Sequence, residues 1–332
     1  MRRRCLILVF LLNLGAEQTL YAQPRHLYSS AVVSGMHLPV WSAKDLGLFQ
    51  KYGLNVDVVV ISGGTIGMQS LLGGSTQTSS SAAMGPINTV LAGGDAVVIG
   101  GVLNKNLLKF VARKEIRKPM DLIGKKIGVT GFGGSNEFGV LLALGEWKIP
   151  RHAVNIIPTG VSAARIASVE AGGSDATVLP YSSAIMAADK GFNTLGDLAE
   201  IVPEFPDRLL IVTRSFLKKE RDTVKRYLQA MSESIYLLKS NRQRERSIAS
   251  FAKVLRAERK IAEEIYDSYQ KVFSFPPRVG KKGMRAVVEI MQQQTGRPKS
   301  DFELARFIDE SVLDELEKEG FFKKLEMEYQ RR

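Results

Sequence analysis

The chain has 332 residues, of which 45% are apolar and 24% charged, so it can bury a globular core and bulk disorder is excluded. The formal net charge is +12, and the basic residues of the C-terminal half alternate with acidic ones at helical spacing, as on solvated helix faces. No nucleic-acid-binding motif or aromatic-interleaved basic patch is present, so no nucleic-acid partner is expected. The positive field would instead favour an anionic solute or an anionic membrane surface.

The N-terminus, residues 1–22, is typical of a secretory signal peptide. Arg2, Arg3 and Arg4 precede a short apolar run over residues 5–14, and Ala22 offers a small residue before the cleavage point. A membrane anchor or a buried first strand is the alternative, although the run is shorter than the about 20 residues that span a bilayer. Cys5 is the only cysteine, so cleavage would leave a chain of net charge +10 without disulfides, cysteine catalysis or zinc–sulfur sites.

Strand and helix patterns alternate over residues 26–113, with Gly, Ser and Pro at the joints. This alternation predicts a mostly parallel sheet covered by helices. The expected strands are 26–34, 55–62, 77–81, 96–102 and 107–113, and the expected helices are 39–52, 66–73 and 86–92.

A polar segment over residues 114–122 is predicted to cross to a second α/β unit. That unit has expected strands 126–130, 154–158 and 176–179 and helices 136–147, 162–171 and 181–190, and strand 209–214 would return the chain. Helical periodicity then continues to the C-terminus. The predicted organisation is one lobe from 26–113 and 215–332 and a second lobe from 114–214.

Small polar residues follow several expected strands, where ligands of open α/β sheets bind. Gly133, Gly134, Ser135 and Asn136 stand in a glycine turn before a helix, whose free N–H groups suit an anion or a carbonyl oxygen. The turn matches neither a dinucleotide fingerprint nor a P-loop. An ordinary capped turn is the alternative, with Gly134 or Ser135 as the cap.

Two comparable positions lie in the first lobe. Ser62, Gly63 and Gly64 follow the second expected strand, and their alternative is again a plain turn. Ser80 and Ser81 end the third strand with hydroxyls that can donate to an oxygen-rich ligand, or they belong to a polar edge strand.

The segment 34–65, with the phrase AKDLGLFQKYGLNV at residues 43–56, resembles solute-binding proteins of ABC importers. It is similar to the SsuA/NMT1/THI5-like branch, which includes binders of aliphatic sulfonates, taurine, nitrate and thiamin precursors. The resemblance extends over residues 26–273. It implies an α/β fold of two lobes, the type II or Venus-flytrap periplasmic-binding-protein fold, with a helical C-terminal tail.

The resemblance also implies ligand contacts in the first strand–helix turn, at Ser34, Met36 and His37, with a plain surface position as the alternative for His37. In the second lobe, Tyr181 would face the cleft and stack on a ligand. Arg165 is the nearest arginine to an expected cleft turn, with a surface position as the alternative.

The expected function is a monomeric periplasmic solute-binding protein that captures a small organic anion, such as a sulfonate or carboxylate, and delivers it to an ABC permease. A thiamin-precursor pyrimidine is the alternative solute, and a sensing domain is the alternative role. Enzymes of the THI5 branch use a histidine and a cysteine-rich iron motif. This chain has three histidines and no cysteine after residue 5, so no enzyme, cofactor or metal site is expected.

Overall fold

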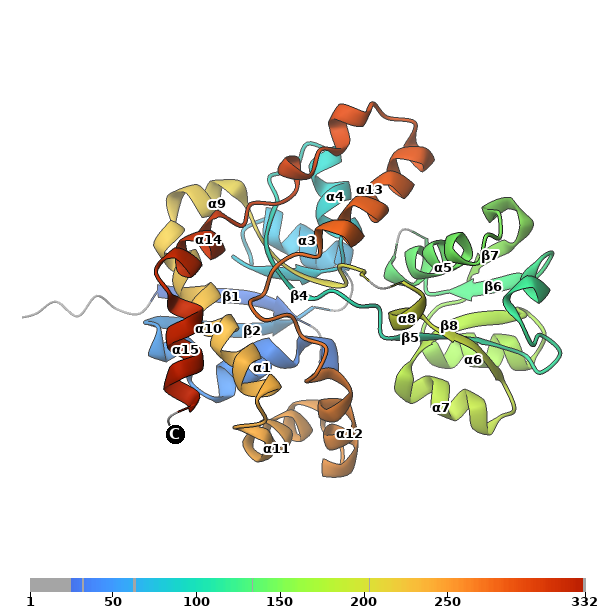
Figure 1. Ribbon diagram of the computed structural model, residues 1–332, viewed down its shortest axis with the longest axis horizontal. Coiled ribbons are helices and arrows are strands. Elements are labelled where there is room, and N and C mark those ends of the chain that lie inside the picture. Colours follow the sequence, from blue (N-terminus) through green and yellow to red (C-terminus); the bar gives the residue numbers. More distant parts are fainter. Residues whose placement is uncertain (1–24, 32, 62–63, 133, 203, 331–332) are drawn as a thin grey trace, which may run out of the picture.

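The computed structural model describes residues 25–31, 33–61, 64–132, 134–202 and 204–330. The expected signal peptide, with Cys5, lies outside these residues. Figure 1 shows two α/β lobes beside each other, with the C-terminal helices on the first.

The sheet of the first lobe has the order β2-β1-β3-β10-β4. A parallel bridge from Ser29 to Thr78 joins the parallel pair β1-β2 to the antiparallel strands β3-β10-β4. These strands are β1 (Arg25–Ala31), β2 (Leu54–Val60), β3 (Ser79–Ser81), β4 (Val97–Leu103) and β10 (Arg208–Val212).

Four α-helices connect the strands before β4 in the first lobe: α1 (Leu38–Asp45), α2 (Leu48–Lys51), α3 (Gly64–Leu72) and α4 (Met84–Leu91). The sequence predicted a single helix over 39–52, and the structure divides it into α1 and α2. Gly47 causes the break, because its φ of +70° is left-handed and cannot continue a helix.

The second lobe has a five-stranded sheet of order β7-β6-β8-β5-β9. Its strands are β5 (Leu108–Ala112), β6 (Lys126–Val129), β7 (Asn155–Pro158), β8 (Ala176–Pro180) and β9 (Asn193–Asp197). Its helices are α5 (Ser135–Glu146), α6 (Ser162–Glu170), α7 (Tyr181–Asp189) and α8 (Leu198–Ile201). The sequence pattern did not predict β9 and α8, which are short elements with partly buried side chains.

The strand pairing differs from the expected lobe boundaries at both crossings. β5, expected in the first lobe, pairs with β8 and β9 of the second sheet, while β10, expected in the second lobe, pairs with β3 and β4 of the first. Both strands run antiparallel to their neighbours, so neither sheet is wholly parallel. The chain therefore crosses at residues 104–107, and the polar segment 114–122 connects β5 to β6 within the second lobe.

The predicted helical tail is confirmed, and it packs on the first lobe (Figure 1). Its helices are α9 (Arg214–Lys219), α10 (Arg221–Lys239), α11 (Arg244–Leu255), α12 (Arg259–Tyr269), α13 (Lys281–Thr295), α14 (Ser311–Lys318) and α15 (Phe321–Gln330). The long helix α10 contacts α1, α2, α14 and α15 and buries an apolar face in the core of the first lobe.

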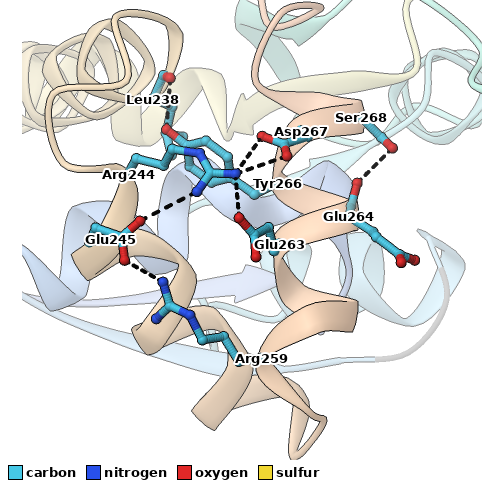
Figure 2. A network of polar contacts seen from close by, with 9 residues as sticks. All are labelled: Leu238, Arg244, Glu245, Arg259, Glu263, Glu264, Tyr266, Asp267 and Ser268. Atoms are coloured by element: carbon cyan, nitrogen blue, oxygen red, sulfur yellow. Dashed lines mark hydrogen bonds and ion pairs between the residues drawn. The ribbon is translucent and has the colours of Figure 1, made fainter.

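Polar contacts also hold this tail together. Figure 2 shows Arg244 of α11 donating to Glu263 and Asp267 of α12, at 2.7 and 2.9 Å, with its guanidinium over the Tyr266 ring. In the described residues, no helix has the length and apolar character needed to cross a membrane. The same residues contain no group of three His, Cys, Asp or Glu side chains placed to hold a metal ion.

Candidate ligand-binding cleft

A cavity of about 530 Å³ lies between the lobes. The first lobe lines it with α3, the end of β3 and the start of α4. The second lobe contributes Thr130 and Phe132 from the turn after β6, and Asn136 from the first turn of α5. We call this cavity the large compartment; its volume falls within the range of about 300–1,000 Å³ that organic ligands occupy.

A second cavity of about 230 Å³, the small compartment, adjoins the first. Thr130, Ser135, Asn136 and Arg208 line both cavities, so the two compartments are neighbours along one cleft. The small compartment is further lined by residues of both lobes: Met36, Asn106, Leu107, Leu108, Val161, Ser162, Arg165, Pro180 and Asp207.

Most of the site residues expected from the sequence lie at this cleft. The large compartment is lined by His37, Gly64, Ser80, Ser81, Gly134, Ser135 and Asn136, and the small one by Met36, Ser135 and Asn136. Ser62, Gly63 and Gly133 were also expected, and they lie outside the described residues.

Ser34 and Tyr181 line neither compartment. The Ser34 hydroxyl lies 3.1 Å from Nδ1 of His37 and so supports a residue that does line the cleft. The Tyr181 hydroxyl donates to both carboxylate oxygens of Asp197, at 2.9 and 2.8 Å. Burial and this carboxylate raise the pKa of Tyr181. These contacts stay within the second lobe, and ligand stacking by Tyr181 remains a prediction.

The glycine turn before α5 presents a helix start to the cleft. Gly134 is the cap residue, with an extended backbone (φ −98°, ψ 167°), and α5 begins at Ser135. The Asn136 amide donates to Thr130 Oγ1 at 3.0 Å, which ties the first helical turn to the end of β6. Gly64, at the start of α3, is a glycine because of a close approach: a Cβ there would stand 3.0 Å from Ser81 Oγ.

Arg208, which the sequence analysis did not single out, lines both compartments from the start of β10. Its Nη1 donates to the Asp207 carboxylate at 3.1 Å and to the Asp207 carbonyl, and its Nη2 contacts Sδ of Met36. Burial raises the pKa of Asp207, against the opposing effect of Arg208. In the sequence, the signal that could have pointed to Arg208 is the charged pair Asp207-Arg208 directly before an apolar strand.

His37 is buried, so the surface alternative is wrong. Burial and the positive charge of Arg208 both lower the pKa of its imidazole well below 6.5. The imidazole is therefore neutral at pH 7. Its Nε2 is buried and has no hydrogen-bond partner within the described structure, so it is available to a ligand as a donor or an acceptor.

Arg165 of α6 is buried, with 2% of its surface exposed, so the surface alternative is wrong. Its Nη1 donates to Thr130 Oγ1 and to the Gly160 carbonyl, each at 2.6 Å, and its Nη2 donates to Ser162 Oγ at 3.2 Å. Burial lowers the pKa of Arg165 to about 10, so the guanidinium is still charged at pH 7.

Apolar side chains stand exposed around the cleft. Phe132 lines the large compartment and is 62% exposed, and Val161 lines the small one and is 69% exposed. Exposed side chains of this size beside a cavity suit an organic ligand or the closure of the lobes over it.

The model of the family described as NMT1/THI5 like matches residues 34–244, which is more than half of the chain. A comparison with curated proteins gave no match.

Solved structures share the fold at low identity. The alkanesulfonate-binding protein SsuA of Xanthomonas axonopodis pv. citri, bound to MOPS, has a TM-score of 0.70 at 18% identity, covering 87% of this chain and 99% of that one. The aliphatic sulphonate binding protein SsuA of Escherichia coli has a TM-score of 0.65 at 21% identity, covering 76% of this chain and 85% of that one. The nitrate-binding protein NrtA of Synechocystis PCC 6803 has a TM-score of 0.69 at 13% identity, covering 87% of each chain. The chain therefore has the periplasmic-binding-protein fold and belongs to the NMT1/THI5-like family.

Proposed function

We propose that this protein captures a small organic anion between its two lobes outside the cytoplasm and delivers it to an ABC permease. The observation that carries the proposal is the cleft itself: a cavity of about 530 Å³ lined by helix starts, hydroxyls and amides from both lobes. A ligand in this position would hold the lobes together, and closure around a ligand is the usual motion of this fold.

The charges of the cleft support an anionic solute. Arg165 and Arg208 line it, and Asp207 is the only carboxylate among the described residues that line either compartment. The fold relatives add support, since the named Xanthomonas and Escherichia proteins bind sulfonates and the Synechocystis protein binds nitrate. A pyrimidine remains the alternative solute, because the exposed ring of Phe132 and the neutral His37 would suit a heterocycle.

The crossings support a hinge between the lobes. Asn104 is held by the first lobe and its tail, through Ser274 Oγ at 2.7 Å and the Arg278 carbonyl at 2.8 Å. Asn106 instead contacts the second lobe, with its amide 3.5 Å from the Ser135 carbonyl. We accordingly propose lobe boundaries at residues 104–107 and 204–207, and that the protein works as a monomer.

Small-angle scattering with a ligand panel tests this function. The panel comprises alkane- and arylsulfonates, carboxylates, nitrate and a thiamin-precursor pyrimidine, and native mass spectrometry of the freshly purified protein looks for a co-purifying solute. We expect an organic anion to bind and to reduce the radius of gyration. Binding without compaction, or no binding by any member, would contradict the proposal.

A further inference from the structure

The two compartments of the cleft differ in charge. The large compartment has Arg208 as its only charged lining residue among those described, since His37 is neutral and no carboxylate lines it. The small compartment is lined by Arg165, Asp207 and Arg208. Because Asp207 accepts from Arg208, this pair offsets its own charge, and the positive charge of Arg165 remains.

Arg165 has no counterion within the described residues. Among the described side chains, no carboxylate lies within 4.0 Å of its guanidinium, and the three hydrogen bonds found there go to a carbonyl and two hydroxyls. A guanidinium has five N–H donors, so two are still unused, and one of them is the buried Nε–H, which has no partner. A charge this deeply buried is costly unless an opposite charge accompanies it.

The surroundings of Arg165 favour an anion at the same place. Ser135 and Asn136 bring the first turn of the twelve-residue helix α5 to the small compartment, and Ser162 brings the start of α6. Helix starts carry unpaired N–H groups and the positive end of the helix dipole. The same compartment has room for one compact group, at about 230 Å³.

We propose that the small compartment holds the single anionic group of the ligand against Arg165, while the large compartment holds an uncharged organic body. The ligand is thus an organic monoanion, and Arg165 is the residue that selects for its charge. The large compartment suits such a body, because Met68, Leu72, Met84 and Phe132 line it among hydroxyls and amides. An inorganic anion would leave this compartment without an occupant. The inference rests on the proposed function, which it makes more specific.

Matched pairs of ligands test the inference in the full protein. Isothermal titration measures hexanesulfonate and benzenesulfonate beside their sulfonamides, and hexanoate and benzoate beside their amides, on wild type, Arg165→Gln, Arg165→Lys and Arg151→Gln. Arg151 is an exposed arginine of the same lobe that lines neither compartment, so its variant controls for the loss of one charge.

We expect wild type and Arg151→Gln to prefer an anion over its neutral partner. Arg165→Gln should weaken the anion by about ten- to hundredfold, the usual effect of losing a charged hydrogen-bond donor, and leave the neutral partner nearly unchanged. Arg165→Lys should restore part of the preference. Without ligand, the melting temperature of Arg165→Gln should fall below that of wild type by no more than the melting temperature of Arg151→Gln does. The reason is that Arg165→Gln removes a buried charge that has no counterion.

Two results would overturn the inference and are distinct from a failure of the proposed function. If Arg165→Gln weakens an anion and its neutral partner equally, Arg165 only shapes the cleft. If wild type binds the neutral partner, or the nitrate of the scattering panel, more tightly than the organic anion, the assignment of the two compartments is wrong. In both cases a ligand still binds and the solute-binding role stands, whereas no binding by any compound together with no compaction would end both proposals.

Discussion

At the scale of single residues, Gly134 offers a test of the cleft that leaves the fold alone. Its φ of −98° is open to any residue, and a Cβ there would approach only the Gly131 carbonyl, at 3.7 Å. Gly134→Leu should therefore fold normally but fill part of the large compartment. We expect the tightest-binding panel member to lose about ten- to hundredfold in affinity by titration calorimetry.

Gly145→Leu, on the exposed side of the same helix, is the matched control for Gly134→Leu. A Cβ at Gly145 meets nothing within 4 Å, so its affinity should equal that of wild type. Equal dissociation constants for the two variants would show that the turn before α5 does not contact the ligand.

The depressed pKa of His37 predicts a loss of stability in acid. The folded protein keeps His37 neutral, because burial and Arg208 lower its pKa well below 6.5, whereas the unfolded chain takes up a proton near pH 6.5. As the pH falls below about 6.5, the unfolded state binds more protons and the free energy of unfolding decreases, by at most about 2 kcal/mol at about pH 5. The pKa of Asp207 is raised, so this carboxyl has the opposite effect on the pH dependence of stability. That effect is present in every variant that keeps Asp207.

Urea unfolding at about pH 7 and about pH 5 measures the effect of His37. His37→Gln should lose less stability over this interval than wild type, while exposed His152→Gln should behave as wild type. The same acid loss in His37→Gln and wild type would mean that other groups carry it.

The sequence located the cleft better than it located the charges within it. Gly64, Ser81 and Asn136 were found because small and polar residues after a strand or at a helix start are visible as a local pattern. Arg208 was missed because it reaches the cleft through β10, whose pairing between β3 and β4 depends on a crossing far along the chain. The burial of Arg165 likewise depends on partners at Thr130 and Gly160, which no local pattern shows.

At the scale of the elements, Glu233 of α10 joins three helices at one buried point. Its carboxylate is fully buried and accepts from Lys51 Nζ at 2.7 Å, from the Tyr52 hydroxyl at 2.6 Å and from the Tyr329 hydroxyl. Glu233→Ala should lower the free energy of unfolding by about 2–3 kcal/mol, because two hydroxyls and an ammonium lose their acceptor. The loss is limited because Lys51 is partly exposed and stays hydrated.

Chemical denaturation of Glu233→Ala beside Glu326→Ala measures this contribution. Glu326 is an exposed glutamate of α15, so its removal should change stability little. Equal denaturation midpoints for both variants would show that the three helices do not depend on the buried carboxylate.

The Arg244 network of Figure 2 contrasts with Glu233. Arg244 pairs with Glu263 and Asp267 across α11 and α12, but these carboxylates are 40% and 53% exposed. Water and salt screen such pairs, so the network orients α12 against α11 more than it stabilises the fold. The buried apolar face of α12, with Ala262 and Tyr266, holds that helix to the core.

The elements also mark where prediction from sequence failed. Apolar runs correctly predicted that β5 and β10 are strands, yet the expected bounds group β5 with the first lobe and β10 with the second, whereas each pairs with the other sheet. A buried strand has the same composition in either sheet, so only pairing between distant segments decides its membership. The division of α1 from α2 was visible in principle, since Gly47 is a typical site for a left-handed residue.

At the scale of the whole molecule, both sheets share one arrangement. In each sheet, the first three strands in spatial order pair in parallel. The fourth strand lies next to a crossing between the lobes; it is β10 in the first lobe and β5 in the second. Each of these two strands thus lies inside the sheet of one lobe, beside the point where the chain crosses to the other lobe. Arg208 at the start of β10 and Thr130 after the end of β6 both line the two compartments, so each sheet contributes one strand end to the same cleft.

The proposed closure of this cleft predicts that the Phe132 ring contributes to ligand affinity but not to the stability of the unliganded protein. The ring is exposed, so Phe132→Ala should leave the melting temperature of the unliganded protein unchanged. In the closed complex the ring would be buried against the ligand or the facing lobe, and its loss should weaken benzenesulfonate by about tenfold or more in titration calorimetry. Met186→Ala is the matched control, because Met186 is similarly exposed on the same lobe, at 59%, but lines neither compartment. If both variants bind benzenesulfonate as wild type does, the exposed ring takes no part in closing the cleft, and the apolar rim belongs to another surface of the molecule.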